Sequence, residues 1–159
     1  EYIKYFFDYY KLNYAILRYA NVYGPRQTIH GEVGVIAIFC DRVIKCRPLI
    51  VYGDGTQTRD YIYVDDIINV IEQVSKSDIC NDTLNVSRNI STNVWELLAY
   101  FYSLTKEDIR ISFESEIKHE IIISKIDNSD LLMSEFLNTM SFKKFISLSE
   151  GIEKLWNEK

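Results

Sequence analysis

Hydrophobic and polar residues recur along the first third of the chain with a period that changes from helix to strand and back. Aromatic residues at helical spacing predict a helix over 1–12, and the apolar run 14–19 predicts a buried strand. Residues 20–26 lead from that strand into a Gly-Pro turn. A helix with a strongly apolar start is expected over 35–43, followed by a short strand over 50–52.

The middle of the chain continues this alternation of helix and strand. A helix is expected over 65–75, and a brief strand follows over 84–86. Another helix begins near Asn93, because Asn93 and Glu96 have the spacing of a capping box. The expected buried face of the 65–75 helix consists of Ile67, Ile68, Val70, Ile71 and Val74.

The last third of the chain repeats the same kinds of element. Alternating apolar residues predict a strand over 109–113, and 121–123 are β-branched and suit another strand. A helix is expected over 129–137, and a capping box of Ser147 and Glu150 opens the final helix. Strands that alternate with helices predict an α/β fold.

The stretch 52–66 carries the clearest candidate chemistry. A Gly-Asp-Gly turn is followed by Arg59 and then by an apolar, aromatic segment that ends at Asp65 and Asp66. A planar guanidinium donates two hydrogen bonds to phosphate oxygens at once, so Arg59 is suited to an anionic ligand. The other interpretation is a hairpin turn with a surface arginine. Asp65 and Asp66 are interpreted as capping residues that stabilise a helix N-terminus, rather than as general bases.

Asn21 lies just beyond the strand predicted over 14–19. Ligands of open α/β sheets bind beyond the carboxyl ends of the strands, and an amide side chain both donates and accepts hydrogen bonds. Asn21 is therefore either a ligand-binding residue or a residue that caps its own turn. The sequence leaves both interpretations open.

Composition and charge narrow the class of protein. The chain has 159 residues, of which 47% are hydrophobic, so one domain with a substantial core is expected. A net charge of -5 disfavours nucleic acid as a partner. An odd number of cysteines without a CxxC motif predicts reduced thiols and a cytoplasmic location. No apolar run approaches the roughly 18 residues of a membrane-spanning helix, so no membrane partner is expected.

Several kinds of catalytic motif are missing from the sequence. His30 and His119 are far apart and have no cysteine or carboxylate at metal-ligand spacing, so no metal site is expected. The motifs GxSxG and GxGxxG and the P-loop are absent as well. The residues alone thus predict a soluble α/β domain with an arginine suited to phosphate, and no catalytic residues.

Three segments in register resemble the extended short-chain dehydrogenase/reductases, and among them the NAD-dependent nucleotide-sugar epimerase/dehydratase family. They are residues 17–27, which read Leu-Arg-Tyr-Ala-Asn-Val-Tyr-Gly-Pro-Arg-Gln, residues 30–39, and residues 52–66. The stretch 30–39 most resembles the UDP-glucose 4-epimerases within that family. The resemblance covers nearly the whole chain and weakens after about residue 105.

The resemblance implies a protein of two lobes, a Rossmann lobe that binds NAD and a smaller lobe that binds a nucleotide sugar. Residues 1–159 would form a single α/β unit, the last elements of the NAD lobe together with the substrate lobe. The family's glycine-rich loop and Tyr-x-x-x-Lys motif lie upstream of the segment that matches Glu1 and Tyr2. We therefore expect a C-terminal fragment that lacks both motifs and is inactive alone.

The resemblance also implies which residues of this chain bind. Three positions match the segment beside the nicotinamide of NAD: Tyr19, Ala20 and Val22. The positions that match the nucleotide-sugar site are Asn21, Gly34, Val35, Ile50, Tyr52 and Arg59. One departure concerns a second diphosphate arginine of the family, whose place is taken here by Ile117. Lys118 and Lys125 are the nearby cations that could substitute for it.

The function implied by the resemblance is UDP-hexose binding within an NAD-dependent sugar 4-epimerase. A nucleotide-sugar 4,6-dehydratase or decarboxylase of the same family is the alternative, and a non-catalytic binding or assembly module is a hypothesis of another class. Relatives dimerise through helices of the NAD lobe, and 1–12 matches the end of one. A homodimeric parent protein is therefore expected, and the chain should expose apolar surface at Tyr2, Phe6 and Tyr9.

Overall fold

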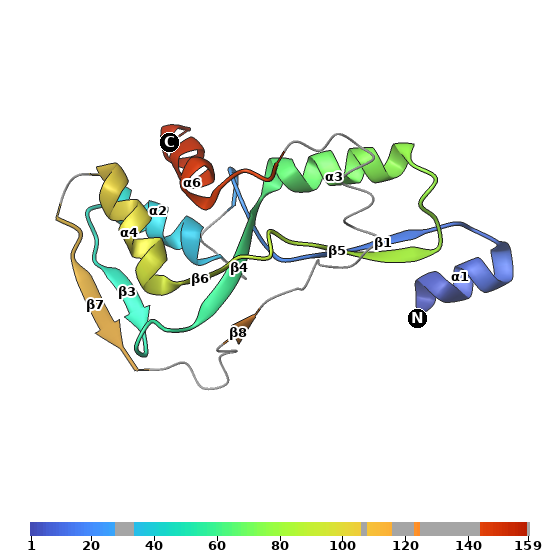
Figure 1. Ribbon diagram of the computed structural model, residues 1–159. Helices are drawn as coiled ribbons and strands as arrows, with labels where there is room; N and C mark the ends of the chain where they lie inside the picture. The colour runs from blue at the N-terminus through green and yellow to red at the C-terminus, as the bar shows by residue number, and fades with distance from the viewer. Residues whose placement is uncertain (28–33, 106–107, 116–122, 125–143, 159) are drawn as a thin grey trace.

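Helices and strands alternate along the chain, as the hydrophobic pattern predicts (Figure 1). The computed structural model describes residues 1–27, 34–105, 108–115, 123–124 and 144–158. In chain order the elements are α1 (Tyr2–Tyr10), β1 (Ala15–Tyr19), β2 (Asn21–Tyr23), α2 (Val35–Ile44), β3 (Leu49–Tyr52), β4 (Thr58–Tyr63), α3 (Val64–Lys76), β5 (Asp82–Val86), β6 (Ser91–Asn93), α4 (Val94–Thr105), β7 (Ile111–Glu114), β8 (Ile123–Ser124) and α6 (Leu148–Asn157).

Paired strands give the described residues their layout. β1 pairs with β5 in parallel, and β3 pairs with β7 in parallel. β4 lies between β2, which is parallel to it, and β6, which is antiparallel, and β8 also pairs with β4. Figure 1 shows α3 above β1 and β5 at one side, and α2 and α4 beside β3 and β7 at the other. β4 runs between these two parts and ends where α3 begins.

The buried apolar residues form two clusters, one on each side of β4. The larger cluster packs α2, α4 and α6 around β3, with Phe39 and Phe101 in edge contact at 5.8 Å between ring centroids. The smaller cluster packs α3 against β5, with Val70 and Leu84 at its centre. α2, α3, α4 and α6 therefore each bury one apolar stripe, and helices packed in this way on strands are the usual basis of an α/β fold.

Both predicted capping boxes are confirmed. The Asn93 amide oxygen accepts from Glu96 N at 2.8 Å, and the Glu96 carboxylate accepts from Asn93 N at 2.9 Å. Ser147 and Glu150 make the same reciprocal pair at the start of α6. Caps of this kind satisfy backbone groups that the helix itself leaves unpaired, so α4 and α6 begin where the sequence predicts.

α3 buries a narrower stripe than the sequence predicts. Ile67, Val70 and Val74 are buried, but Ile68 and Ile71 are 52% and 44% exposed. The three buried residues have the i, i+3, i+7 spacing of one helix face, and the other two belong to the neighbouring stripe. The expectation that all five are buried was therefore wrong for Ile68 and Ile71.

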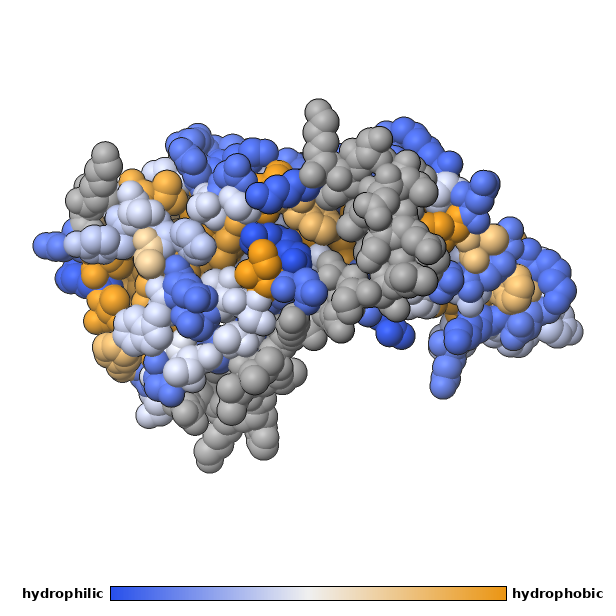
Figure 2. Space-filling view, viewed as in Figure 1, coloured by the Kyte–Doolittle hydropathy of each residue, from blue (hydrophilic) through white to orange (hydrophobic). Residues whose placement is uncertain are grey.

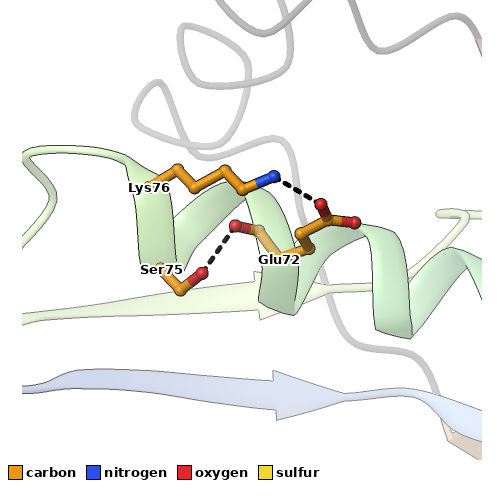
Figure 3. Close-up of polar contacts among 3 residues, drawn as sticks. All are labelled: Glu72, Ser75 and Lys76. Carbon is orange, nitrogen blue, oxygen red and sulfur yellow. Dashed lines mark hydrogen bonds and ion pairs between the residues drawn. The ribbon is translucent and has the colours of Figure 1, made fainter.

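The solvent side of α3 is polar near its C-terminal end. Lys76 forms an ion pair with Glu72 one turn earlier, and Ser75 Oγ donates to Glu72 O at 2.7 Å (Figure 3). An exposed pair of this kind stabilises a protein by about 1 kcal/mol at most. These contacts support the helix end and do not form a site.

β1 is not the buried strand that its apolar sequence predicts. Ala15, Arg18 and Tyr19 are exposed, and Ile16 and Leu17 are only partly buried. A parallel strand is buried when both faces of its sheet are covered, and α3 covers one face here. The apolar sequence of 14–19 indicates that these residues tend to be buried. It does not indicate which other element packs against them.

α1 extends from the β1 end of the structure and has no buried residue (Figure 1). Tyr2, Phe6 and Tyr9 are 84%, 46% and 71% exposed. The helix packs mainly on itself, with the rings of Tyr5 and Tyr9 stacked at 5.6 Å. Tyr2, Phe6 and Tyr9 are thus exposed, as expected, and Figure 2 shows a few apolar residues among mainly polar ones at this end. Self-association through these side chains stays a prediction, which light scattering tests.

Two sequence expectations fall partly or wholly outside the described residues. The helix predicted over 129–137 lies outside them, and so do Ile121 and Ile122 of the strand predicted over 121–123. The last residue of that predicted strand, Ile123, begins β8.

Candidate functional site

A pocket of about 420 Å³ lies among β2, α2, β3 and β4. Its walls are formed by β2, by one face of α2, by the end of β3 and by β4. All six residues expected at a nucleotide-sugar site line it: Asn21, Gly34, Val35, Ile50, Tyr52 and Arg59. These residues are spread over nearly forty positions of sequence, and the fold brings them to one cavity.

Arg59 is the second residue of β4 and is half-buried at the pocket wall. Its backbone lies opposite Thr92 of β6, and its Nη1 donates to Thr58 O at 2.9 Å. A guanidinium carries five N–H donors in a planar fork. The pairing of β4 with β6 thus fixes the position of the Arg59 backbone at the pocket wall.

Asn21 begins β2, next to Arg59's strand. Its Nδ2 donates to Asp60 O at 2.9 Å, so the side chain does not cap its own turn. The side-chain nitrogen must face Asp60 O, because a carbonyl oxygen only accepts hydrogen bonds. The structure therefore holds the amide in a set orientation at the pocket, and one of the two interpretations left open by the sequence is excluded.

The turn between β3 and β4 is part of the pocket. Gly53 and Gly55 have φ angles of 62° and 75°, a left-handed conformation that glycine adopts without strain. Gln57 Nε2 donates to Tyr52 O at 3.1 Å and closes the turn, and both residues line the pocket. The sequence left two interpretations of this stretch, a simple hairpin turn or a binding site. In the structure the turn places Tyr52 and Arg59 at the same cavity, so the two interpretations are compatible.

Sequence reasoning missed one cation of the pocket. Arg42 lines it from α2, and its Nη1 donates to Pro48 O at 2.8 Å. Val35, Ile38 and Arg42 have the i, i+3, i+7 spacing of one helix face, and all three line the pocket. That spacing was the signal that could have identified Arg42 once Val35 was placed at the site.

The three residues expected beside NAD lie where β1 passes into β2. Val22 lines the pocket and also packs on the smaller apolar cluster. Ala20 N donates to Val86 O at 3.0 Å, which ties this junction to β5. Tyr19 is 38% exposed at the end of β1. Of the three, only Val22 lines the pocket.

Asp60 is a buried carboxylate that the sequence did not single out. Its two oxygens accept from Arg88 N at 3.3 Å and from Ile90 N at 3.2 Å. Burial raises the pKa of Asp60 above its ordinary value, and the backbone amides that it accepts from offset part of this shift. Since Asn21 bonds to Asp60 O, this carboxylate connects the 88–90 loop to the strand beneath the pocket.

Asp65 and Asp66 do not cap α3 through their side chains. The N-cap residue is Tyr63, which makes no side-chain capping bond, and the two aspartates lie in the first turn. Asp66 is buried, and its Oδ2 accepts from Ile146 N at 2.9 Å. The place of both aspartates in the first turn agrees with the expected position at the helix N-terminus, where the helix dipole favours acidic residues. The side-chain hydrogen bond of Asp66, however, joins α3 to the segment before α6.

Burial raises the pKa of Asp66, which makes its effect on stability dependent on pH. The native carboxyl keeps its proton at a pH at which the unfolded chain has lost it, so stability falls as pH rises from about 4 through the native pKa. We expect urea unfolding at a series of pH values to show this decline, and Asp66→Asn to make it shallower. Asp65→Asn, at the exposed neighbour, is the control, and an unchanged slope in Asp66→Asn would contradict the assignment.

Other chemistry is limited in the part of the chain that the structure describes. These residues contain no group of three or more His, Cys, Asp and Glu placed to hold a metal ion. Neither is any of the described helices long and apolar enough to cross a membrane. His30, His119, Ile117, Lys118 and Lys125 all lie outside the described residues.

A Tyr-x-x-x-Lys spacing does occur in this chain, at Tyr102 and Lys106, contrary to the expectation that the motif is absent. Tyr102 is 56% exposed on α4 and does not line the pocket, and Lys106 lies outside the described residues. The spacing is therefore not in the place that the family's motif would occupy.

Comparison with known proteins agrees with the fold and the pocket. The model of the "NAD dependent epimerase/dehydratase family" matches residues 1–87 of the 159. The chain therefore belongs to this family, whose cofactor is NAD. The resemblance and the fold class inferred from the three sequence segments are both confirmed.

Curated relatives of this chain include epimerases, 4,6-dehydratases and a decarboxylase. A protein of Methanocaldococcus jannaschii named "Putative UDP-glucose 4-epimerase" is 36% identical over 99% of this chain and 49% of its own length. More distant relatives include a UDP-N-acetyl-alpha-D-glucosaminuronate decarboxylase of Bacillus cytotoxicus, 25% identical over 88% of this chain and 44% of its own, and a dTDP-D-glucose 4,6-dehydratase of Homo sapiens, 26% identical over 96% and 43%. The chain spans about half the length of the curated relatives it matches.

Solved structures show the same fold. A UDP-glucose 4-epimerase of Thermotoga maritima, solved with UDP-glucose, superposes with a TM-score of 0.86 and 31% identity over 98% of this chain and 48% of its own. A UDP-N-acetylglucosamine 4-epimerase of Methanobrevibacter ruminantium, solved with UDP-N-acetylmuramic acid, gives a TM-score of 0.86 and 30% identity over 99% and 50%. The α/β arrangement described above is thus that of the epimerases.

Proposed function

We propose that this chain supplies the nucleotide-sugar binding part of an NAD-dependent 4-epimerase that acts on a UDP-hexose. The observation that carries the proposal is the gathering of six expected binding residues at one pocket of about 420 Å³. The similarity to a UDP-glucose 4-epimerase solved with UDP-glucose supports the choice of ligand. A volume of this size falls in the range of small-molecule pockets, roughly 300–1,000 Å³.

Each wall of the pocket has a chemistry that suits one part of a UDP-sugar. Arg59 presents a guanidinium fork for the diphosphate, and Asn21 adds a held amide near the same end. Ile50 and Tyr52 offer an apolar strand surface for the base. Gly34 and Val35, at the start of α2, bring backbone and a small apolar side chain against the nucleotide.

The residues expected beside NAD fit one part of that cofactor. Val22 adds an apolar side chain to the pocket next to Asn21, which suits packing against the face of a planar ring. Tyr19 and Ala20 would border the same ring from the β1 end, since they directly precede Asn21. Bound NAD+ supplies a hydride acceptor, and the proposed task of these residues is to place its nicotinamide against the sugar and exclude water there.

The isolated chain is expected to bind UDP but not to turn over UDP-galactose in the presence of NAD+. The pocket residues needed for the nucleotide are present, whereas the sequence contains no glycine-rich dinucleotide motif. Its one Tyr-x-x-x-Lys spacing begins at Tyr102, away from the pocket. Calorimetry with UDP and a coupled assay for UDP-glucose test the two halves separately. No heat of binding would refute the pocket assignment, and measurable turnover would refute the inactivity.

A second candidate is a nucleotide-sugar 4,6-dehydratase or decarboxylase, because relatives with these names cover most of the chain. The choice of base separates the epimerase proposal from a dTDP-sugar dehydratase. Competition calorimetry with UDP and dTDP is the direct test, and tighter binding of dTDP would favour the dehydratase. A non-catalytic binding module is the third candidate, and it would bind nucleotide as part of a whole protein that shows no turnover.

The exposed aromatic face of α1 supports a homodimeric parent protein. Tyr2, Phe6 and Tyr9 form a surface that a second copy could cover, although half of a typical relative lies outside this chain. Light scattering on the whole protein tests this assembly, and a monomer would contradict it.

A further inference from the structure

The turn that precedes Arg59 is held from outside the pocket by an exposed tryptophan. Trp95 lies in the first turn of α4, and its Nε1 donates to Asp54 O at 2.8 Å. The neighbouring Val94 N donates to Gly55 O at 3.2 Å. Two successive residues of α4 therefore bond to two successive residues of the turn, some forty positions earlier in the chain.

The indole also packs closely against the turn. A Cβ atom at Gly55 would lie 2.8 Å from Trp95 Nε1, so the ring occupies the space that any other residue at 55 would need. On its other side, the ring of Trp95 contacts Phe113 of β7 at 5.9 Å between centroids. β7 holds the turn as well, because Gly53 N donates to Glu114 O at 3.0 Å. Trp95 thus contacts both the turn and β7.

The same support continues to Arg59. Gln57 Nε2 closes the turn on Tyr52 O, and β4 begins at the next residue, Thr58. Arg59 pairs with Thr92 of β6, and β6 runs directly into α4 at Val94. The position of Arg59 is therefore set by its pairing with β6 and β8 and by the turn before it, and Trp95 bonds to that turn from the first turn of α4.

We propose that Trp95 is a positioning residue for phosphate recognition, acting through the turn on Arg59 without touching the ligand. The inference rests on the proposed nucleotide-binding function of the pocket. If Trp95 served only to cover Phe113, it would need no hydrogen bond to Asp54, yet it makes one. Trp95 is also 43% exposed, so burial of its ring is incomplete. The indole N–H is a donor only, so the Asp54 contact fixes the ring in one orientation.

The experiment compares UDP with uridine, which lacks the phosphates. Trp95→Phe keeps an aromatic ring and removes the N–H donor, and we expect UDP affinity to fall about three- to tenfold by calorimetry, the size of one lost hydrogen bond. Uridine affinity, followed by NMR titration, is expected to stay unchanged, because only the diphosphate contact depends on Arg59. Trp156→Phe, which changes the other tryptophan, and Phe113→Leu, which keeps the indole bond, are controls expected to bind UDP as the unaltered chain does.

The outcomes separate this inference from the proposed function. Equal UDP affinity in Trp95→Phe would overturn it, and so would an equal loss for uridine, which would indicate a general change of the pocket. If Trp95→Phe does not fold, Trp156→Phe leaves Trp95 as the single indole, and UDP is expected to change its fluorescence emission. An unchanged emission at saturating UDP would overturn the inference. An unaltered chain that binds neither UDP nor uridine would refute the proposed function itself, and this inference with it.

Discussion

The substitution Gly151→Ala is expected to lower the free energy of unfolding by about 3 kcal/mol, the upper part of the range for overpacking in a core. Gly151 is buried in α6, where the helix crosses Tyr23. A Cβ atom at this position would overlap Tyr23 Oη and lie 2.8 Å from Cζ of the same ring. Tyr23 is only 2% exposed, so its ring has little room to move away.

The direction of this effect is informative because alanine normally stabilises a helix relative to glycine by about 0.5–1 kcal/mol. Glu153→Ala, at an exposed position of the same helix, is the matched control and should change stability little. Adding Tyr23→Phe to Gly151→Ala removes the nearest atom of the clash and should restore part of the loss. Urea unfolding of the original chain and these three variants measures this, and a Gly151→Ala chain as stable as the original would contradict the close packing of α6.

The sequence predicted the elements better than it predicted their surroundings. The capping boxes at Asn93 and Ser147 use contacts within three residues, so local sequence is sufficient to place α4 and α6. The burial of Ile68 and Ile71 depends on what packs against α3, which periodicity does not report. Ile68 and Ile71 are hydrophobic, but the stripe of α3 that packs against the strands is the neighbouring one, which contains Ile67, Val70 and Val74.

The buried carboxylates show the same limit for polar residues. Asp66 looks like an ordinary acidic residue of a helix N-terminus, yet its partner is Ile146, eighty positions away. Asp60 accepts from backbone amides of the 88–90 loop, and nothing in its local sequence indicates this. A side chain whose role depends on distant backbone groups becomes visible only when the fold is known.

The pocket residues were accessible to sequence reasoning for a different reason. Asn21 and Arg59 were candidates from their own chemistry and position, and the resemblance among three segments then assigned both to one site. The strand pairing of β2 with β4 places them together. Arg42 was missed because no segment of the resemblance drew attention to it, although helical spacing from Val35 would have pointed to it. Strand order could not be deduced from the chain, so the shared cavity itself was not predictable.

The substitution Arg59→Ala is expected to weaken UDP binding about ten- to a hundredfold, since charge-assisted hydrogen bonds contribute roughly 1.5–3 kcal/mol each. The reason is electrostatic, because the guanidinium at the start of β4 is the cation assigned here to the diphosphate. Arg59→Lys keeps the charge and loses the planar fork, so its affinity should fall between those of Arg59→Ala and the original chain. The measurement is calorimetric titration with UDP at fixed, low ionic strength.

Arg18→Ala provides a matched control, because Arg18 is exposed on β1 and does not line the pocket. It removes the same net charge as Arg59→Ala, so a long-range effect of charge would weaken UDP binding in both variants. Added salt should reduce the affinity of the original chain more than that of Arg59→Ala, since a direct ion contact is screened only where it exists. Equal UDP affinity in the original chain and in Arg59→Ala would show that the phosphates do not contact Arg59, and Arg42, a second arginine among the described lining residues, would be the next candidate.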